Sequence, residues 1–366
     1  MMIQNLSCAE WSIPLKVPFR QANQETQTSA SVIVQIETRE GVLGFGESCP
    51  RAYVSGESLY AVRRGLILIK PFLIGQSLAS LEEVPELLDL VRPHLGPAAL
   101  CGLELALLDA WGKEQNQSLF ELMSDPHPQT FAYAGVIPIG PVEKLRPILS
   151  GFQFSEVKIK VGPDRANNQA RLNLVRECFG PEVAVRVDAN TGWSLTEAQK
   201  EIPFWLAQGV NIFEQIFPPA ENENMLKIMQ NFGHEAYFVA DESLTCLDSA
   251  KRLLENRICN RLNLKISKHG GIFQSLAIYD YAKSHGVSCQ LGAHYGETGL
   301  LTSAGLLFSA LRKEVTAREG AYGTHLLEKD ICDPSLKFDH RGELSLPFPN
   351  MGTGLGLKIM PEVLKD

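Results

Sequence analysis

The sequence has no pair of cysteines spaced as C-x-x-C, although eight cysteines are scattered along its 366 residues. Several of them lie inside apolar stretches, where the reduced cysteines of a protein core are found. Their spacing gives no sign of a disulfide framework. We therefore expect reduced thiols and a cytoplasmic location.

Long apolar runs and basic clusters are also missing. No stretch has the roughly 18 apolar residues of a membrane-spanning helix. The first residues, "MMIQNLSCAEWSIPLKVPF", lack the basic start and apolar run of a secretory signal. The formal net charge is −8 at pH 7. With no basic stripe in the sequence, neither nucleic acid nor an anionic membrane is expected as a partner.

What remains is the composition of a soluble globular protein, with 45% apolar and 21% charged residues. A chain of this length exceeds the usual size of a single hydrophobic core. We expect one large and one smaller domain, or two domains of similar size.

The first part of the chain, 1–125, is predicted to be an α+β domain. Residues 30–47, "ASVIVQIETREGVLGFGE", alternate apolar and polar side chains and turn at Glu40 and Gly41, as a β-hairpin does. Residues 58–125 place apolar side chains three and four positions apart, which predicts helices.

The second part, 126–330, alternates short apolar strands with helical stretches. The eight expected strands are 130–138, 156–162, 183–190, 210–217, 236–243, 261–267, 287–294 and 315–323. Repeated βα units of this kind predict an α/β fold with a parallel (β/α)8 barrel of the TIM type, with an open doubly wound sheet as the alternative. The tail, 331–366, has a turn signal at 340–342 and no further βα unit, so we expect it to pack against the first domain.

The strand "EVKIKVG", 156–162, carries two lysines on one face. Val157, Ile159 and Val161 point one way by the period-2 rule, and Lys158 and Lys160 point the other way. In a parallel sheet, which is buried on both sides, two adjacent lysines lose hydration and repel each other. Such a pair indicates a site that uses the two charges.

Ionisable residues also close the strands that follow. The five positions are Lys160, Asp188, Glu214, Asp241 and Lys268, and successive members are 28, 26, 27 and 27 residues apart, one βα unit each time. Since the active site of a barrel lies at the carboxyl ends of its strands, this spacing places all five on one rim. Any one of them alone has a plain alternative as a helix cap or a solvated loop residue.

Three carboxylates on consecutive strands, Asp188, Glu214 and Asp241, predict a site for a hard cation. Mg²⁺ is the first choice because it takes few protein ligands and leaves positions open for substrate oxygens, and Mn²⁺ fits the same ligands. The alternative is that each acid pairs with a nearby Arg or Lys, which is costly in a buried site.

The lysines near these three acids are expected to have different roles in the site. Lys160 and Lys268 are expected on opposite sides of the acids, where a lysine close to a cation can act as a general base. Lys158, one pleat deeper, suits a fixed positive charge for a substrate carboxylate. Lys265 competes with Lys268, but we prefer Lys268 because it stands beside the flexible turn Gly270–Gly271.

The motifs "GFGESCPRAYVSGES", "KIKVG", "RVDANTGW", "FEQIFPP", "VADES", "NLKISKHGGI" and "GAHYGETGLL", taken in order, resemble the enolase superfamily and its muconate-lactonising-enzyme subgroup. The resemblance covers almost the whole chain. It implies a capping domain, completed by the tail, that closes over a modified barrel, with loops near 20–26 and 49–58 covering the substrate. Family members are commonly oligomeric, which implies a homo-oligomer here.

The resemblance also implies roles for individual residues. Asp188, Glu214 and Asp241 match the metal ligands, Lys160 and Lys268 match the acid/base pair, and Lys158 matches its electrostatic partner. Asn190 and Glu297 match supporting positions at the substrate site. The chemistry common to the family is removal of the proton α to a carboxylate, which gives an enediolate. Electrostatic stabilisation must carry most of that reaction because such carbon acids are very weak.

A base on each face favours racemisation or epimerisation of an amino-acid derivative. A lyase or cycloisomerase, like o-succinylbenzoate synthase or muconate cycloisomerase, uses the same lysines and is the first alternative. A non-catalytic binding protein is the second.

The segment "PRAYVSGES" is similar to dipeptide epimerases such as L-Ala-D/L-Glu epimerase. The Asp-x-Asp pair that those enzymes carry at the eighth strand is absent, and "TAREGAYG" stands in its place. Here Glu319 could bind the cation of a dipeptide or betaine, or pair with Arg318 instead. An N-acylated amino acid would not need it.

Overall fold

The computed structural model describes residues 1–21, 24–124, 129–333, 335–346 and 352–360. Within this part of the chain, no helix is long and apolar enough to cross a bilayer. The sequence-based expectation for the substrate-covering loop at 20–26 falls partly outside the described residues, at positions 22–23.

The first domain begins with a three-stranded antiparallel sheet. Its strands are β1 (Ile3–Gln21), β2 (Gln24–Thr38) and β3 (Leu43–Ser48), in the order β1-β2-β3. The tight turn between β2 and β3 uses Gly41 in the left-handed region, with φ 79°. The predicted hairpin is therefore confirmed.

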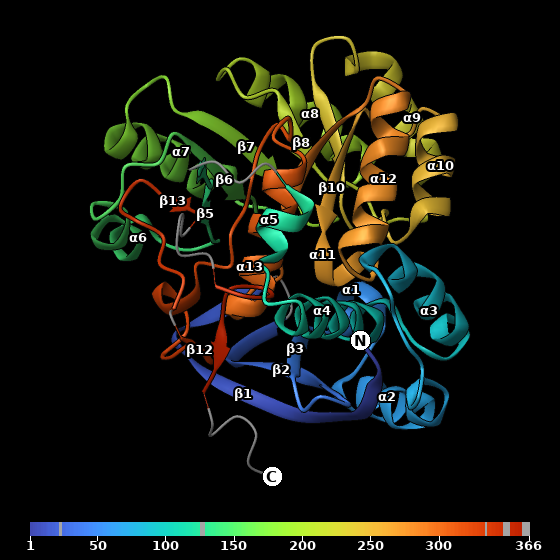
Figure 1. Cartoon of the computed structure of the whole chain (residues 1–366). Helices are drawn as coiled ribbons and strands as arrows, with labels where there is room; N and C mark the ends of the chain where they lie inside the picture. The colour runs from blue at the N-terminus through green and yellow to red at the C-terminus, as the bar shows by residue number, and fades with distance from the viewer. Residues whose placement is uncertain (22–23, 125–128, 334, 347–351, 361–366) are drawn as a thin grey trace.

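Helices α2 (Leu59–Leu73) and α4 (Pro97–Glu114) pack on this sheet (Figure 1). The domain also contains α1 (Ala52–Ser55), α3 (Val84–Val91) and α5 (Leu119–Met123), with 3-10 turns at Leu81–Glu83 and Arg92–His94. Helix α4 is buried around most of its circumference because it lies between the sheet and the second domain. A Cβ at Gly46 would meet the carbonyl oxygen of Gly102 at 2.0 Å, so only glycine allows β3 to approach α4 this closely.

The second domain is a parallel barrel. Seven strands are hydrogen-bonded in the order β11-β10-β9-β8-β7-β6-β5. They are β5 (Gly135–Ile137), β6 (Glu156–Lys160), β7 (Ala184–Asp188), β8 (Ile212–Glu214), β9 (Tyr237–Ala240), β10 (Arg261–Lys265) and β11 (Ser288–Gly292).

The eighth strand position is held by single bridges. Arg318 bridges Leu291 of β11, and Glu319 bridges Ala134, which precedes β5. These bridges close the sheet on itself, which excludes the open doubly wound alternative. The predicted barrel with a capping domain is confirmed.

Helices form the outer layer of the barrel (Figure 1). They are α6 (Val142–Leu149), α7 (Arg165–Phe179), α8 (Leu195–Leu206), α9 (Asn222–Phe232), α10 (Leu247–Glu255), α12 (Ile272–Ser284) and α13 (Gly299–Leu311), with a 3-10 turn at Gly323–His325. The short helix α11 (Ile266–His269) follows β10 and packs against α4.

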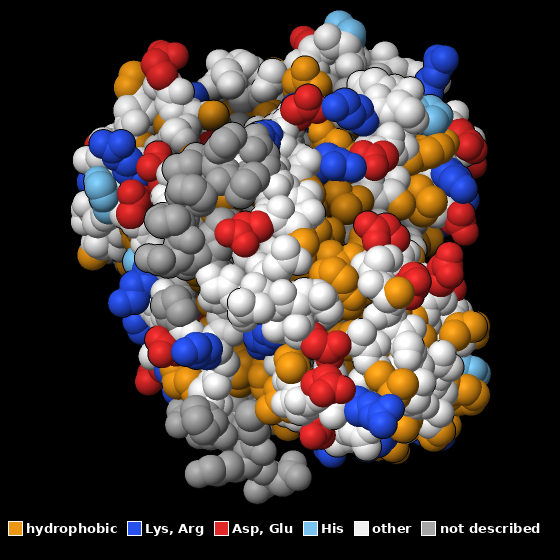
Figure 2. Space-filling model, in the orientation of Figure 1, with side chains coloured by type: hydrophobic (Ala, Val, Ile, Leu, Met, Phe, Trp, Pro, Cys, Tyr) orange, Lys and Arg blue, Asp and Glu red, His pale blue; other side chains and the backbone are white. Residues whose placement is uncertain are grey.

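The tail contacts both domains. Strand β13 (Glu343–Ser345) pairs with β4 (Thr130–Ala132), and β12 (Cys332–Asp333) pairs with β14 (Lys358–Ile359). The N–H of Leu355 donates to Asp109 of α4 at 2.9 Å. Figure 2 shows acidic and basic side chains interspersed over the described part of the face in view.

Candidate active site

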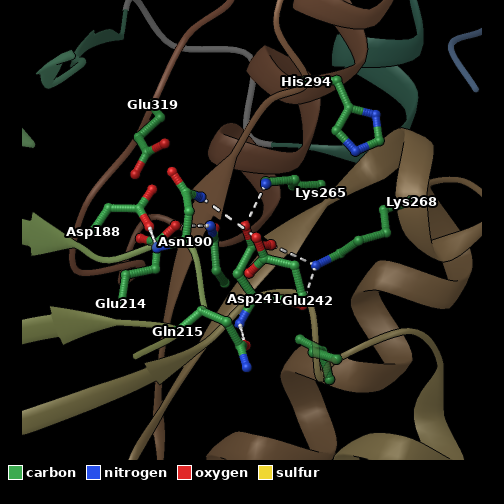
Figure 3. Close-up of polar contacts among 12 residues, drawn as sticks. Asp188, Asn190, Glu214, Gln215, Asp241, Glu242, Lys265, Lys268, His294 and Glu319 are labelled. Carbon is green, nitrogen blue, oxygen red and sulfur yellow. Dashed lines mark hydrogen bonds and ion pairs between the residues drawn. The ribbon is translucent and has the colours of Figure 1, made fainter. Parts of the chain in front are cut away.

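The acidic side chains converge at the carboxyl ends of the central strands. Asp188 and Glu214 are the last residues of β7 and β8, and Asp241 directly follows β9. The register places Lys160 beside Asp188 and Asp188 beside Glu214. Figure 3 shows the three acids directed toward one region, between strands. The one-unit spacing in the sequence therefore does place them on one rim.

These carboxylates fit a hard divalent cation. Asp188, Glu214 and Asp241 are 1%, 0% and 4% exposed. Among the described residues, none donates a hydrogen bond to the Oδ2 atom of Asp188, although the Nζ atom of Lys158 lies 3.2 Å away. An all-oxygen set of buried carboxylates, with one oxygen left without a hydrogen-bond donor, suits Mg²⁺.

Lys158 is the central cation of the site. Its Nζ atom lies 3.0 Å from Glu214 and 2.7 Å from Glu319, in addition to Asp188. Burial acts to lower the pKa of this ammonium group, but the three carboxylates outweigh burial and raise the pKa well above its ordinary value. These surroundings favour the charged form of Lys158.

Glu319 lies inside the barrel, in ion pairs. One oxygen contacts Lys158, and the other accepts from Nη1 of Arg186 at 2.9 Å. Arg318 does not pair with it, but stacks over Phe131 at 4.8 Å and donates to the backbone of Lys313. Glu319 thus pairs with Lys158 and Arg186 and not with Arg318. Whether it binds a substrate cation stays a prediction.

Lys160 stands at the β6 side of the acids. Its Nζ atom donates to Oδ1 of Asn190 at 2.8 Å and lies 3.8 Å from Asp188. Asn190 adopts a left-handed conformation, with φ 43°, and its N–H donates to Asp188 at 2.9 Å. Asparagine adopts the left-handed region more readily than most other non-glycine residues. Asn190 thus orients both a lysine and an acid.

Lys265 stands at the opposite side, on β10. It is the last residue of the strand, and its Nζ atom lies 2.6 Å from Oδ2 of Asp241. Burial opposes its charge, but the attraction of Asp241 outweighs burial and raises the pKa of Lys265. In Figure 3 the side chain extends over the acids.

Lys268 lies one helical turn further, in α11. Its Nζ atom donates to Oδ1 of Asp241 at 2.7 Å and to the main-chain oxygen of Asp241 at 2.6 Å. The side chain is 1% exposed. The ammonium group of Lys268 is bound to main-chain oxygen, whereas Lys265 ends the strand and its Nζ atom contacts the carboxylate of Asp241. The sequence-based preference for Lys268 over Lys265 as the base stays a prediction.

A layer of polar side chains below the rim was missed by sequence reasoning. Arg186, Asn263 and Gln290 point inward two residues before the ends of β7, β10 and β11. Asn263 and Gln290 donate to the two oxygens of Glu214, at 3.1 and 2.8 Å. The period-2 rule that singled out Lys158 applies to these positions too, and could have found them.

Gln215 was missed as well. It has φ 36°, and its Oε1 atom accepts from the backbone N–H groups of Asp241 and Ser243, at 2.8 and 3.1 Å. It thereby fixes the direction in which Asp241 leaves β9. The only sequence signal is its position directly after Glu214.

Glu297 lies in the loop between β11 and α13, apart from the three acids. Its Oε1 atom accepts from the N–H of His294 at 2.7 Å. Burial raises its pKa to about 8. Whether it contacts substrate stays a prediction.

Fold and site together define a barrel enzyme with a capping domain, in which buried acids suited to a cation are flanked by lysines. Two family models match the chain. The mandelate racemase / muconate lactonizing enzyme amino-terminal domain matches residues 4–124, and the enolase C-terminal domain-like model matches residues 142–363. The chain belongs to the mandelate racemase / muconate lactonizing enzyme family of the enolase superfamily, and the resemblance noted in its motifs is confirmed.

Relatives of known activity span nearly the whole chain. A hydrophobic dipeptide epimerase of Enterococcus faecalis is 27% identical over 86% of this chain and 89% of its own. An N-succinyl-L-Arg/Lys racemase of Bacillus cereus is 27% identical over 97% and 94%.

Solved structures of these and related proteins share the fold. The Bacillus cereus racemase superposes with a TM-score of 0.89 at 26% identity, over 100% of this chain and 97% of its own. A substrate-liganded L-Ala-D/L-Glu epimerase of Bacillus subtilis gives a TM-score of 0.86 at 27% identity, over 98% and 99%. The Enterococcus faecalis dipeptide epimerase, complexed with Mg and L-Leu-L-Tyr, gives 0.88 at 24% identity, over 98% and 100%.

Proposed function

We propose that this chain is a Mg²⁺-dependent racemase or epimerase that removes and returns the proton α to the carboxylate of an amino-acid derivative. The observation that carries the proposal is the placement of lysines on the two sides of the acids. Lys160 stands beside Asp188 and Asn190 on β6, and Lys265 stands beside Asp241 on β10. The names of the relatives, epimerase and racemase, support the same reaction.

In this proposal Asp188, Glu214 and Asp241 would hold Mg²⁺, which would supply positive charge to the substrate carboxylate. With the charge of Asp241 shared with the cation, the pKa of Lys265 would fall. The Mg complex of the Enterococcus faecalis relative supports this assignment. Mn²⁺ suits the same oxygen ligands. Lys158 adds a fixed positive charge to the carboxylate side of the substrate.

The proton moves between the substrate and the two lysines. One neutral lysine takes the α-proton from its face, and the other, in its ammonium form, delivers a proton to the opposite face. The result is inversion at the α-carbon without any other change. We assign these roles to Lys160 and Lys265 rather than to Lys160 and Lys268. The Nζ atom of Lys268 is committed to the main chain at Asp241.

The substrate class follows from Glu319. Both of its oxygens are engaged, by Lys158 and Arg186, so it is not available to a substrate ammonium group. N-acylated amino acids therefore come first among the candidate substrates, ahead of dipeptides and betaines. The similarity to an N-succinyl-amino-acid racemase supports this order.

The test is α-proton exchange in D2O with Mg²⁺, followed by mass spectrometry, against N-acyl amino acids, dipeptides and amino-acid betaines. We expect one class to gain a single deuteron with inversion. Lys251→Ala, an exposed lysine on α10, serves as the control and should exchange normally. Loss of water or formation of a ring would identify a lyase or cycloisomerase instead. Metal binding without exchange of any compound would indicate a binding protein.

A further inference from the structure

Three side chains of metal-ligand type meet at the interface, or seam, between the capping domain and the barrel. They lie apart from the acidic rim, which is formed by Asp188, Glu214 and Asp241. Cys49 follows β3 of the capping domain, and His294 and Glu297 belong to the loop between β11 and α13 of the barrel. They are 0%, 4% and 5% exposed. One donor atom from each lies within 4.8 Å of the donor atoms of the other two.

His294 has a free ring nitrogen in this cluster. Its Nδ1 atom lies 3.2 Å from the carbonyl oxygen of Cys49. A carbonyl oxygen only accepts, so Nδ1 carries the proton and Nε2 presents its lone pair. Among the described residues, Nε2 has no hydrogen-bond partner although it is buried. A histidine that donates one N–H to a backbone carbonyl and leaves the other nitrogen bare has the arrangement of a metal ligand. Figure 3 shows the ring on the side of the site that carries Lys265 and Lys268.

The loop that carries His294 and Glu297 is fixed by a hydrogen bond of its own and by the capping domain. The carboxylate of Glu297 accepts from the N–H of His294 at 2.7 Å. The hydroxyl of Ser29 in β2 donates to the carbonyl of Gly296 at 2.7 Å, and the hydroxyl of Thr298 donates to Glu47 of β3 at 2.6 Å. The potential ligands are therefore positioned before any ion arrives.

We propose that Cys49, His294 and Glu297 form a second metal site, for Zn²⁺ or another transition metal ion that accepts sulfur, nitrogen and oxygen ligands. A thiolate, a neutral imidazole and a carboxylate together balance the charge of a dication. In tetrahedral Zn²⁺ sites, ligand atoms lie about 3.4 to 3.6 Å apart. Atoms already within 4.8 Å need to approach by about 1 Å or slightly more.

The neighbouring cation, Arg51, makes hydrogen bonds outside the cluster, although its charge also acts on Cys49 and Glu297. Arg51 directs its Nη2 atom to the carbonyl of Tyr295 at 2.6 Å and its Nη1 atom to the carbonyls of Ala30 and Pro50, at 3.1 and 2.9 Å. Its guanidinium therefore links the capping domain to the barrel loop.

A metal ion here would join residues of the two domains that are 245 positions apart in the chain. It would hold the capping domain closed over the barrel mouth on the Lys265 side. The two sites should also prefer different metal ions. A thiolate and an imidazole favour Zn²⁺ and similar transition metal ions, whereas the three carboxylates of the acidic rim favour Mg²⁺.

The experiment uses the full chain, stripped of metal, held in saturating Mg²⁺ and titrated with Co²⁺ as a spectroscopic probe for Zn²⁺. One equivalent of Co²⁺ should give a thiolate-to-cobalt charge-transfer absorption, and Zn²⁺ should abolish it by displacement. Cys49→Ser should remove the absorption. Cys259→Ser, at another buried cysteine before β10, should keep it.

Two further variants test the site if Cys49→Ser does not fold, and separate it from the Mg²⁺ site. Glu297→Gln preserves the size of the side chain and should weaken Co²⁺ binding at least about tenfold, even if Cys49→Ser does not fold. Asp188→Asn should lose Mg²⁺ binding and keep the thiolate absorption, so failure of this site is distinguishable from failure of the rim. No thiolate absorption from folded wild-type chain, or an absorption that survives Cys49→Ser in folded protein, overturns the proposal.

Discussion

The Nζ atom of Lys265 lies 2.6 Å from Oδ2 of Asp241. Lys268 holds the other oxygen of the same carboxylate. Although burial alone would raise the pKa of Asp241, the two ammonium groups hold it well below its ordinary range. One acid is thus shared by a strand lysine that enters the site and a helix lysine that anchors the loop. This division gives the two neighbouring lysines different tasks, which mutation can separate.

Lys160 and Lys265 should each exchange the α-proton of one enantiomer of the substrate. In Lys160→Ala the α-proton of one enantiomer should still exchange in D2O, through Lys265, while exchange of the other falls by about 10²-fold or more. Lys265→Ala should show the reverse preference. The measurement is exchange of each enantiomer separately by NMR. Equal loss for both enantiomers in both variants would contradict a lysine on each face.

Lys268→Met should mainly cost stability. It leaves the main-chain oxygen of Asp241 without its donor in a buried site, and we expect a loss of about 3 kcal/mol in unfolding free energy. Urea denaturation gives the value, with Lys251→Met as the exposed control. If Lys268→Met keeps full stability but removes exchange of one enantiomer only, Lys268 is the base and the assignment to Lys265 is wrong.

Glu319→Gln tests whether that carboxylate belongs to the barrel interior. Lys158 and Arg186 would lose a shared buried counter-charge, so we expect a destabilisation of about 3 kcal/mol, with no change in the order of preferred substrates. The matched control is Glu182→Gln, at an exposed position. A selective loss of cationic substrates, with stability unchanged, would show that Glu319 binds substrate after all.

Mg²⁺ should stabilise the chain through the acidic rim. Binding to the folded state alone adds about 2.7 kcal/mol at a concentration one hundred times Kd. A rise in Tm on adding Mg²⁺, absent in Asp188→Asn and Glu214→Gln, is the expected result. Equal Mg²⁺ stabilisation in these variants would place the ion elsewhere.

Glu104 should make stability fall as the pH rises. It caps the first turn of α12 from α4, and burial raises its pKa from 4.5 to about 8, against the opposing N–H groups of Ile272 and Phe273. Between these values the folded chain keeps a proton that the unfolded chain releases. Its stabilising contribution is therefore complete below about pH 4.5 and is lost as the pH rises through about 8.

Glu104→Gln removes this titration, so the decline of Tm between pH 6 and pH 8 should be shallower than in the wild type. Glu121→Gln, at an exposed position of α5, should leave the slope unchanged. An identical slope in Glu104→Gln would show that the carboxyl stays ionised throughout.

The amino-acid sequence determined the strand order, the strand ends and the rim. Period-2 alternation fixed which face Lys158 and Lys160 share, and the repeat of one βα unit placed Asp188, Glu214 and Asp241 side by side. These properties follow from backbone geometry that is the same in every parallel barrel.

Only the tertiary structure decided which charges neutralise one another. Glu319 pairs with Lys158 and Arg186 from strands far away in sequence, and Lys268 turns to a main-chain oxygen because a short helix carries it past the rim. The seam cluster of Cys49 and His294 likewise exists only because two domains pack together. Such contacts depend on side-chain directions across a closed barrel and a domain interface, which periodicity along a single chain does not encode.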